Sequence, residues 1–294
     1  MRILLLGATG QVGWELTRTL SVLGELRTTT RSGRCDLQLD TSDLRQLQAT
    51  LDSVAPDVIV NATAYTAVDK AENEPQRAML LNAEVPGVIG AWAATHGALV
   101  IHYSTDYVYD GRKQAPYVET DATNPISVYG RSKLAGDQAL LASGCTAIVL
   151  RVSWVYGMRG NNFLRTMQRL MQERSTLNIV DDQLGAPTWC RTIAQVTSTV
   201  LAKMPDAKDA RQALGGIYQL APGGSTSWFG FATAIRDALG LPCTLHPIPG
   251  SEYPTPAARP MNSRMNATKL EDTFGLMLPG WEGDLVLCLG AETD

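Results

Sequence analysis

Apolar and polar residues alternate along the first half of the chain in a pattern typical of α/β proteins. Four continuous apolar runs are expected to be strands buried on both faces of a parallel sheet, at residues 3–6, 58–60, 98–102 and 147–152. The first run is followed by apolar residues at helical spacing, Trp14, Leu16, Leu20 and Leu23. A fifth strand is predicted at 25–29, before a helix that begins near Ser42. These elements predict an α/β fold with a doubly wound parallel sheet.

The regular alternation of strand and helix ends near residue 155. Beyond it the pattern predicts helices at 163–171, 192–203 and 227–239, strands at 177–180 and 217–220, and a proline-rich loop at 247–260. We therefore predict two domains, a first over 1–154 and a smaller C-terminal one over 155–294, with some later segments returning to the first.

Composition narrows the class of ligand. Of the 294 residues 45% are hydrophobic, which supports a sizeable core. The net charge of −4 argues against nucleic acid or an anionic membrane as the main partner. No apolar run approaches the length of a membrane-spanning helix, and the N-terminal run is too short for a signal peptide, so we expect a cytoplasmic protein that binds small molecules. The cysteines and histidines are scattered, without disulfide-framework or metal-ligand spacing.

A glycine-rich turn, GATGQVG, follows the first strand. Gly7, Gly10 and Gly13 let the backbone bend and approach a pyrophosphate, and Gln11 and Val12 lie where the free amides of a helix N-terminus would meet it. The spacing GxxGxxG differs from the GxGxxG dinucleotide fingerprint, and an ordinary tight turn has similar residues. Its position at the start of a βα unit favours dinucleotide binding.

The end of the second strand bears on the choice of cofactor. Three threonines ending at Thr30 are followed by Arg31, with Arg34 nearby, where an NAD-binding protein usually has an acid. Hydroxyls and arginine suit a 2′-phosphate, so we predict NADPH in preference to NADH. A solvated turn is the simpler alternative. Asp40 is expected either to meet the adenine edge or to cap the following helix.

Polar and small residues follow two central strands. Ala62, Thr63 and Ala64 come after residues 58–60, where small side chains let a cofactor lie against the backbone. Thr105, Asp106 and Tyr107 come after the strand at 98–102, at the edge of an open parallel sheet where ligands bind. Turn formation alone would also explain these residues.

Tyr129 and Lys133 are four residues apart and share one face of a predicted helix. A phenol with a pKa near about 10 needs a neighbouring cation to act as an acid or base at neutral pH, and Lys133 can supply that charge. The same spacing occurs by chance on many solvated helices.

The glycine turn, the hydroxyl cluster and the Tyr-x-x-x-Lys pair together resemble the extended short-chain dehydrogenase/reductase superfamily, in which Thr (or Ser), Tyr and Lys form a catalytic trio beside the nicotinamide. Finer motifs resemble the dTDP-4-dehydrorhamnose reductase family; they lie at residues 61–72, 103–108, 151–157, 161–163, 182–188 and 259–264. The resemblance covers nearly the whole chain. It implies a Rossmann-type NAD(P)-binding domain followed by a domain that binds the sugar nucleotide.

The implied reaction is reduction of the C4 ketone of dTDP-4-dehydro-β-L-rhamnose to dTDP-β-L-rhamnose by NADPH, in the supply of rhamnose for surface polysaccharide. By this resemblance Tyr129 protonates the developing alkoxide and Thr105 hydrogen-bonds the reacting oxygen. Lys133 lowers the pKa of the phenol and holds the nicotinamide ribose. Asp106 and Tyr107 would lie in the substrate site.

The resemblance also assigns nucleotide-sugar contacts in the second half. Trp154 would stack on the sugar or thymine, although a core tryptophan is the simpler interpretation. Arg259, Asn262 and Ser263 would donate hydrogen bonds to the pyrophosphate, although a lone loop arginine is usually solvent-exposed.

Members of this family can carry Mg²⁺ at a homodimer interface, held by acidic side chains. Glu15 matches one of these acids, but Arg191 stands where another is expected, and an arginine repels a cation. The sequence therefore leaves both the Mg²⁺ ion and the homodimer open. Arg191 would instead pair with an acid of a partner subunit, and Glu15 would be a favourable charge near a helix N-terminus.

Two alternative functions stay open at this point. One is another nucleotide-sugar reductase, epimerase or dehydratase of the superfamily, which would typically retain tightly bound NAD. The other is a non-catalytic role like that of the regulatory β subunit of methionine adenosyltransferase. The intact set of Thr105, Tyr129 and Lys133 favours catalysis.

Overall fold

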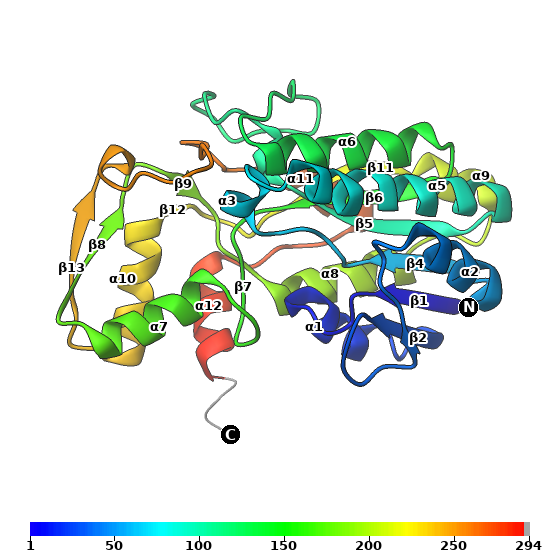
Figure 1. The fold of residues 1–294 in the computed structure, drawn as a ribbon. Coiled ribbons are helices and arrows are strands. Elements are labelled where there is room, and N and C mark those ends of the chain that lie inside the picture. Colours follow the sequence, from blue (N-terminus) through cyan, green and yellow to red (C-terminus); the bar gives the residue numbers. More distant parts are fainter. Residues whose placement is uncertain (291–294) are drawn as a thin grey trace.

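The computed structural model describes residues 1–290 and is built around a seven-stranded parallel sheet (Figure 1). The strand order is β3-β2-β1-β4-β5-β6-β11. Their bounds are β1 (Arg2–Leu6), β2 (Glu25–Thr30), β3 (Leu37–Gln38), β4 (Val58–Asn61), β5 (Leu99–Thr105), β6 (Thr146–Val152) and β11 (Gly216–Leu220). The chain builds outward from β1 to β3 and then crosses back to β4 on the other side of β1. This confirms the predicted doubly wound sheet, with its switch point between β1 and β4.

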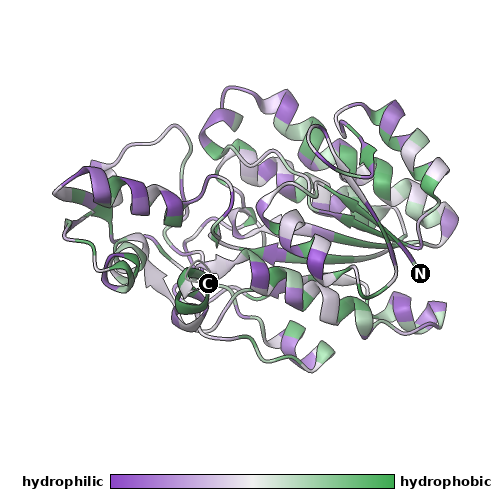
Figure 2. Cartoon of the chain, turned by 90° about the horizontal axis from the view of Figure 1, so that it is seen from below, coloured by the Kyte–Doolittle hydropathy of each residue, from purple (hydrophilic) through white to green (hydrophobic). Residues whose placement is uncertain are grey.

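Both faces of the sheet are covered by helices, as the continuous apolar runs predicted. Ile3 and Leu5 of β1 face one layer, α1 (Gln11–Thr19), α8 (Cys190–Ala202) and α11 (Thr268–Phe274). Leu4 and Leu6 face the other layer, α2 (Leu44–Val54), α5 (Val85–His96) and α6 (Val128–Ala142). Figure 2 shows the strands as a hydrophobic centre between amphipathic helices. Successive strand residues point to opposite faces, so a strand covered on both sides must be apolar throughout.

The second lobe has a core of its own. Helices α7 (Phe163–Glu173), α10 (Trp228–Leu239) and α12 (Trp281–Gly290) pack with a parallel pair, β8 (Thr176–Val180) and β13 (Thr244–Ile248). In Figure 1 this lobe lies to the left of the sheet. Strand β13 was not predicted, because Pro247 suggested a loop; the strand pairs only with β8, and an edge strand tolerates proline.

Short elements join the two lobes or cover the sheet. They are β7 (Val155–Tyr156), β9 (Leu184–Gly185), β10 (Thr188–Trp189), β12 (Thr226–Ser227), α3 (Val68–Ala71), α4 (Pro75–Met79), a π-helix (Leu80–Glu84), α9 (Lys208–Ala213), and 3₁₀ turns at Asp106–Val108 and Gly250–Glu252. Three later segments, α8, β11 and α11, pack on the sheet although they follow residue 155.

Candidate active site

The glycine turn forms a backbone cradle at the carboxyl end of β1. Gly7 has a φ of 84°, in the left-handed region where glycine is favoured. A Cβ on Gly13 would lie 2.1 Å from the Gly7 carbonyl oxygen, so only glycine lets helix and turn approach this closely. Gly10 precedes α1 without a side-chain cap, and the first turn of α1 has no acidic residue. The backbone amides at the start of α1 are therefore free to bind a pyrophosphate, as a dinucleotide cofactor requires.

The end of β2 lies against this cradle. Thr30 is buried, and its hydroxyl lies 2.9 Å from that of Thr9 in the glycine turn. Arg31 follows with an exposed side chain. Asp40 accepts hydrogen bonds from the amide and hydroxyl of Ser42, which lower the pKa of its carboxyl. Asp40 does not cap the next helix; that alternative is wrong, because α2 begins at Leu44 and is capped by Asp43.

The turn after β4 meets the turn after β1. A Cβ on Gly7 would lie 2.9 Å from Cγ2 of Thr63 and 3.0 Å from the carbonyl oxygen of Ala62. The side chain of Asn61, at the end of β4, accepts hydrogen bonds from the Thr63 amide at 3.1 Å and hydroxyl at 2.6 Å. Ala62, Thr63 and Ala64 are all partly exposed, so they can line the cleft beside the cradle.

The predicted catalytic residues meet where β5 ends and α6 begins. Ser127 caps α6 and thereby fixes the first turn, which carries Tyr129. Burial raises the pKa of the Tyr129 phenol, while a hydrogen bond with the Thr105 hydroxyl acts in the opposite direction. Tyr107 packs edge-on against Tyr129, with ring centroids 5.6 Å apart. The fold thus brings Thr105, Tyr107 and Tyr129 together.

Lys133 lies below this group and is 1% exposed. Its Nζ donates to the Tyr103 carbonyl oxygen at 2.6 Å and lies 3.3 Å from Nε2 of His102. Burial lowers the pKa of Lys133 to about 8, against the raising effect of Asp137. We expected Lys133 to lower the pKa of Tyr129; in this arrangement burial dominates and the shift has the opposite direction. Sequence reasoning missed His102, because its partners come from different parts of the chain.

Two residues predicted to contact the substrate are hydrogen-bonded within the protein. Both amide hydrogens of Asn262 are donated to the carbonyl oxygens of Lys113 and Ala115, at 2.7 and 3.0 Å. The prediction for Asn262 is therefore corrected: its side chain anchors the loop at 113–115 and has no N–H left for a pyrophosphate. Ser263 is buried and hydrogen-bonds to Asp106. Burial raises the pKa of Asp106 to about 6.

Arg259 already has an anionic partner. Its guanidinium donates to both carboxylate oxygens of Asp69, at 3.0 and 2.8 Å. These bonds hold the pKa of Asp69 below its ordinary value. The pair joins α3 of the larger lobe to the loop before Pro260, so an incoming pyrophosphate would compete with Asp69 for Arg259.

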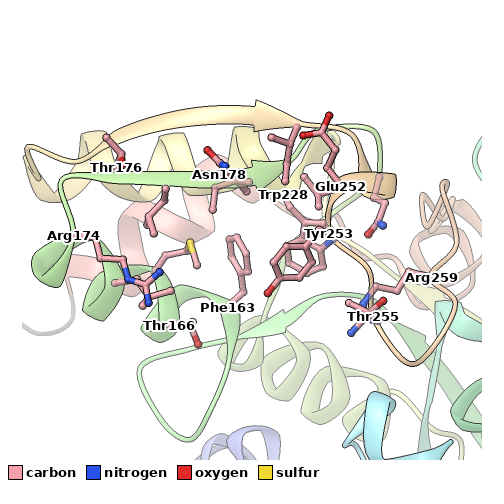
Figure 3. A pocket seen from close by; sticks show the side chains of 17 residues that line it. Phe163, Thr166, Arg174, Thr176, Asn178, Trp228, Glu252, Tyr253, Thr255 and Arg259 are labelled. Carbon is pink, nitrogen blue, oxygen red and sulfur yellow. The ribbon is translucent and has the colours of Figure 1, made fainter.

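A cavity of about 660 Å³ lies in the second lobe, between α7, β8 and the loop around Tyr253. Figure 3 shows the side chains that line it, including Phe163, Trp228 and Arg259. Trp154 stacks on Trp228 with ring centroids 3.6 Å apart, so Trp154 holds one of the lining rings. The sequence predicted a helix from Phe163 but did not indicate that this side chain or Trp228 lines a cavity. Each is the first residue of its helix.

The two residues relevant to Mg²⁺ pair with each other. Nε of Arg191 donates to Glu15 at 3.2 Å within the same chain, so neither needs a partner subunit to balance its charge. Within residues 1–290, no cluster of three His, Cys, Asp or Glu side chains is arranged to hold a metal ion. No helix in this part of the chain is long and apolar enough to span a membrane.

The doubly wound sheet, the glycine cradle and the Thr105, Tyr129 and Lys133 group define a reductase of the extended short-chain dehydrogenase type. The family model described as "RmlD substrate binding domain" matches residues 1–293. A dTDP-4-dehydrorhamnose reductase of Burkholderia thailandensis is 44% identical over 98% of both chains. The Salmonella typhimurium enzyme of that name is also 44% identical, over 96% of this chain and 95% of its own. The chain belongs to the dTDP-4-dehydrorhamnose reductase family.

Solved structures agree with this assignment. A Bacillus anthracis dTDP-4-dehydrorhamnose reductase in complex with NADP has a TM-score of 0.90 at 30% identity, over 99% of both chains. A Thermus thermophilus UDP-glucose 4-epimerase in complex with NAD has a TM-score of 0.81 at 17% identity, over 99% of this chain and 98% of its own. The second likeness concerns the fold alone.

Proposed function

We propose that the protein reduces the C4 ketone of dTDP-4-dehydro-β-L-rhamnose to dTDP-β-L-rhamnose with NADPH. The observation that carries the proposal is the grouping of Thr105 and Tyr129 at the carboxyl end of β5, with Lys133 beneath them. This is the sheet edge that also carries the glycine cradle, so a nicotinamide and a ketone can meet there. The relatives' name supplies the substrate.

The cofactor would lie across the switch point between β1 and β4. The amides at the start of α1 would hold its pyrophosphate, and Ala62, Thr63 and Ala64 would pack beside it. Thr30 and the exposed Arg31 would face the adenosine ribose, with Asp40 in the adjoining loop. A 2′-phosphate would pair with Arg31, which favours NADPH over NADH; the NADP complex of the Bacillus anthracis relative agrees.

Tyr129 would act as the proton donor. When bound, NADPH would supply the hydride to the ketone carbon. Thr105 would hydrogen-bond the carbonyl oxygen as negative charge develops on it, and Tyr129 would give that oxygen its proton. Because burial raises the pKa of Tyr129, the phenol keeps its proton at neutral pH until an alkoxide forms. Lys133 would hold the nicotinamide ribose from below.

The nucleotide end of the substrate would occupy the cavity of the second lobe, between α7, β8 and the loop around Tyr253. Phe163 and Trp228 offer flat apolar faces for a thymine, and Trp154 supports Trp228 from behind. Arg259 lines the same cavity. Its guanidinium would give up its hydrogen bonds to Asp69 and bind the pyrophosphate instead. Ser263 and Asp106 would orient the sugar next to Tyr107.

Cellular setting and assembly belong to the proposal as well. We expect the reaction in the cytoplasm, in the synthesis of activated rhamnose for surface polysaccharide; whether the chain assembles as a homodimer stays open. The ion pair of Glu15 with Arg191 favours a protein that does not need Mg²⁺ there.

The reaction can be followed by the absorbance of reduced nicotinamide, with substrate generated in place by the preceding enzymes. Tyr129→Phe is expected to lower turnover by about a hundredfold or more while NADPH affinity stays nearly unchanged. Tyr156→Phe is a matched control, because the buried Tyr156 hydroxyl has no hydrogen-bond partner in the described part of the chain. Near-normal turnover of Tyr129→Phe would contradict the role of Tyr129, and no NADPH oxidation by the folded parent protein would contradict the reaction.

A further inference from the structure

A chain of buried hydrogen bonds runs from the cofactor turn to Lys133. It passes from Thr63 to Asn61, from Asn61 Nδ2 to His102 Nδ1 at 3.1 Å, and from His102 Nε2 to Lys133 Nζ at 3.3 Å. Asn61, His102 and Lys133 are each 1% exposed. Water therefore does not compete for these groups, and each must satisfy its hydrogen bonds within the chain.

The Thr63 amide sets the orientation of Asn61. A backbone N–H can only donate, so the Asn61 atom 3.1 Å away must be the amide oxygen. The amide nitrogen of Asn61 then faces His102, and it can only donate as well. Nδ1 of His102 is consequently the acceptor, which places the proton of the neutral imidazole on Nε2.

This tautomer presents a donor to Lys133. An ammonium group has no lone pair, so two donors would face each other across the 3.3 Å between Nε2 and Nζ. The neutral amine can accept from Nε2–H and still donate to the Tyr103 carbonyl oxygen at 2.6 Å. The contact therefore favours the neutral amine over the ammonium.

We propose that Asn61 and His102 are positioning residues that lower the proton affinity of Lys133 by holding an Nε2–H donor against its amine. The inference rests on the proposed function, because Lys133 takes part in the reduction only if Tyr129 and the cofactor meet above it. Lys133 then gives up or regains its proton near neutral pH. An ordinary lysine, with a pKa near about 10.4, would stay charged.

Other titratable groups around Lys133 also affect its protonation. Asp137, one helical turn further along α6, favours the ammonium and is shared with Arg151 of β6. Tyr129 precedes Lys133 on the same helix, β5 contributes His102, and the 3₁₀ turn after β5 contributes the buried Asp106. Burial lowers the pKa of His102 far below its ordinary value, so the imidazole stays neutral and adds no charge.

The first test is the tautomer of His102 in the unmodified protein, which needs no activity. Long-range ¹H–¹⁵N NMR detects the ring nitrogens of His96, His102 and His246, and single substitutions assign the signals. The His102 ring should be neutral with its proton on Nε2 from pH 6 to 9, a range that spans the ordinary histidine pKa of about 6.5. An Nδ1–H tautomer, or a protonated ring in this range, would overturn the inference whether or not the protein reduces the proposed ketone.

The second test is the pH dependence of kcat/KM for NADPH oxidation. In Asn61→Asp the carboxylate still accepts from Thr63 but must also accept from His102, which moves the ring proton to Nδ1 and turns Nε2 toward Lys133 as an acceptor. The limb of the profile that falls as Lys133 loses its proton should then move up by about one pH unit or more, because an anion and an acceptor both favour the ammonium.

Thr63→Val is the control for the position of the falling limb, not for the rate itself, because Thr63 lines the cofactor cleft. It keeps the backbone N–H that orients Asn61 and the methyl that packs on Gly7, and replaces the hydroxyl, with its hydrogen bond to Asn61, by a methyl group. Its falling limb should stay at the parent position. A limb unmoved in Asn61→Asp, or moved equally in Thr63→Val, would show that the tautomer does not control Lys133. If Asn61→Asp does not fold, the NMR result on the unmodified protein decides alone.

Discussion

Replacing Arg151, a buried residue near the catalytic group, by methionine should lower the free energy of unfolding. Arg151, in β6, is 1% exposed and lies 3.4 Å from Oδ2 of Asp137. Its other terminal nitrogen donates to the Tyr109 hydroxyl at 2.8 Å. Asp137 is equally buried; its Oδ2 also accepts from Ser104, and its Oδ1 has no partner among the described residues. In Arg151→Met the carboxylate keeps one hydrogen bond and loses its ion-pair partner, so that only the more distant charge of Lys133 still favours its ionised form.

The size of the effect follows from this burial. Removing one partner of a buried ion pair costs about 3–5 kcal/mol, since the remaining charge is left without compensation. Burial already raises the pKa of Asp137, and loss of Arg151 raises it further. A carboxyl whose folded pKa exceeds its unfolded value is destabilising once the unfolded chain ionises. The cost should therefore grow as the pH rises above the ordinary carboxyl pKa of about 4.

Urea unfolding at pH 5 and pH 8 measures this difference. The control is Arg169→Met, the same substitution in an exposed pair with Glu173 on α7, which should change the free energy of unfolding by less than about 1 kcal/mol. Arg151→Met with Asp137→Asn should recover a large part of the loss, because no buried charge is then unpaired. A single variant within about 1 kcal/mol of the parent at pH 8 would refute the reasoning.

Two further predictions concern the cofactor. Gly13→Ala should weaken NADPH binding about tenfold or more, measured by fluorescence titration, because its Cβ would lie 2.1 Å from the Gly7 oxygen and the resulting backbone shift costs about 1–3 kcal/mol. Gly87→Ala is the control: its Cβ would meet its nearest neighbour at 3.6 Å, and affinity should not change. Arg31→Ala should reduce the preference for NADPH over NADH about tenfold, as expected for an exposed charged hydrogen bond; an unchanged ratio of kcat/KM values would exclude Arg31 as the 2′-phosphate partner.

The sequence contained the information for the larger lobe because that information is local. Continuous apolar runs such as 58–60 gave strands in the sheet, since a strand covered on both faces must be apolar at every position. Gly7 and Gly13 indicated the cradle because a tight turn next to a helix excludes a Cβ. The second lobe was predicted less completely. Strand β13 was missed because Pro247 is acceptable only on an edge strand, and sequence does not tell which strand lies at an edge.

The sequence by itself determined the fold class and the glycine cradle, because each depends on residues close together in the chain, and the resemblance to a known family pointed to the group of Thr105, Tyr129 and Lys133. Only the tertiary structure decided which side chains from distant parts of the chain contact one another. It paired Arg259 with Asp69, used the amide of Asn262 to anchor a loop, and placed His102 against Lys133. Such contacts join helices, strands and loops up to 190 residues apart, so they depend on topology and burial, which no local pattern encodes.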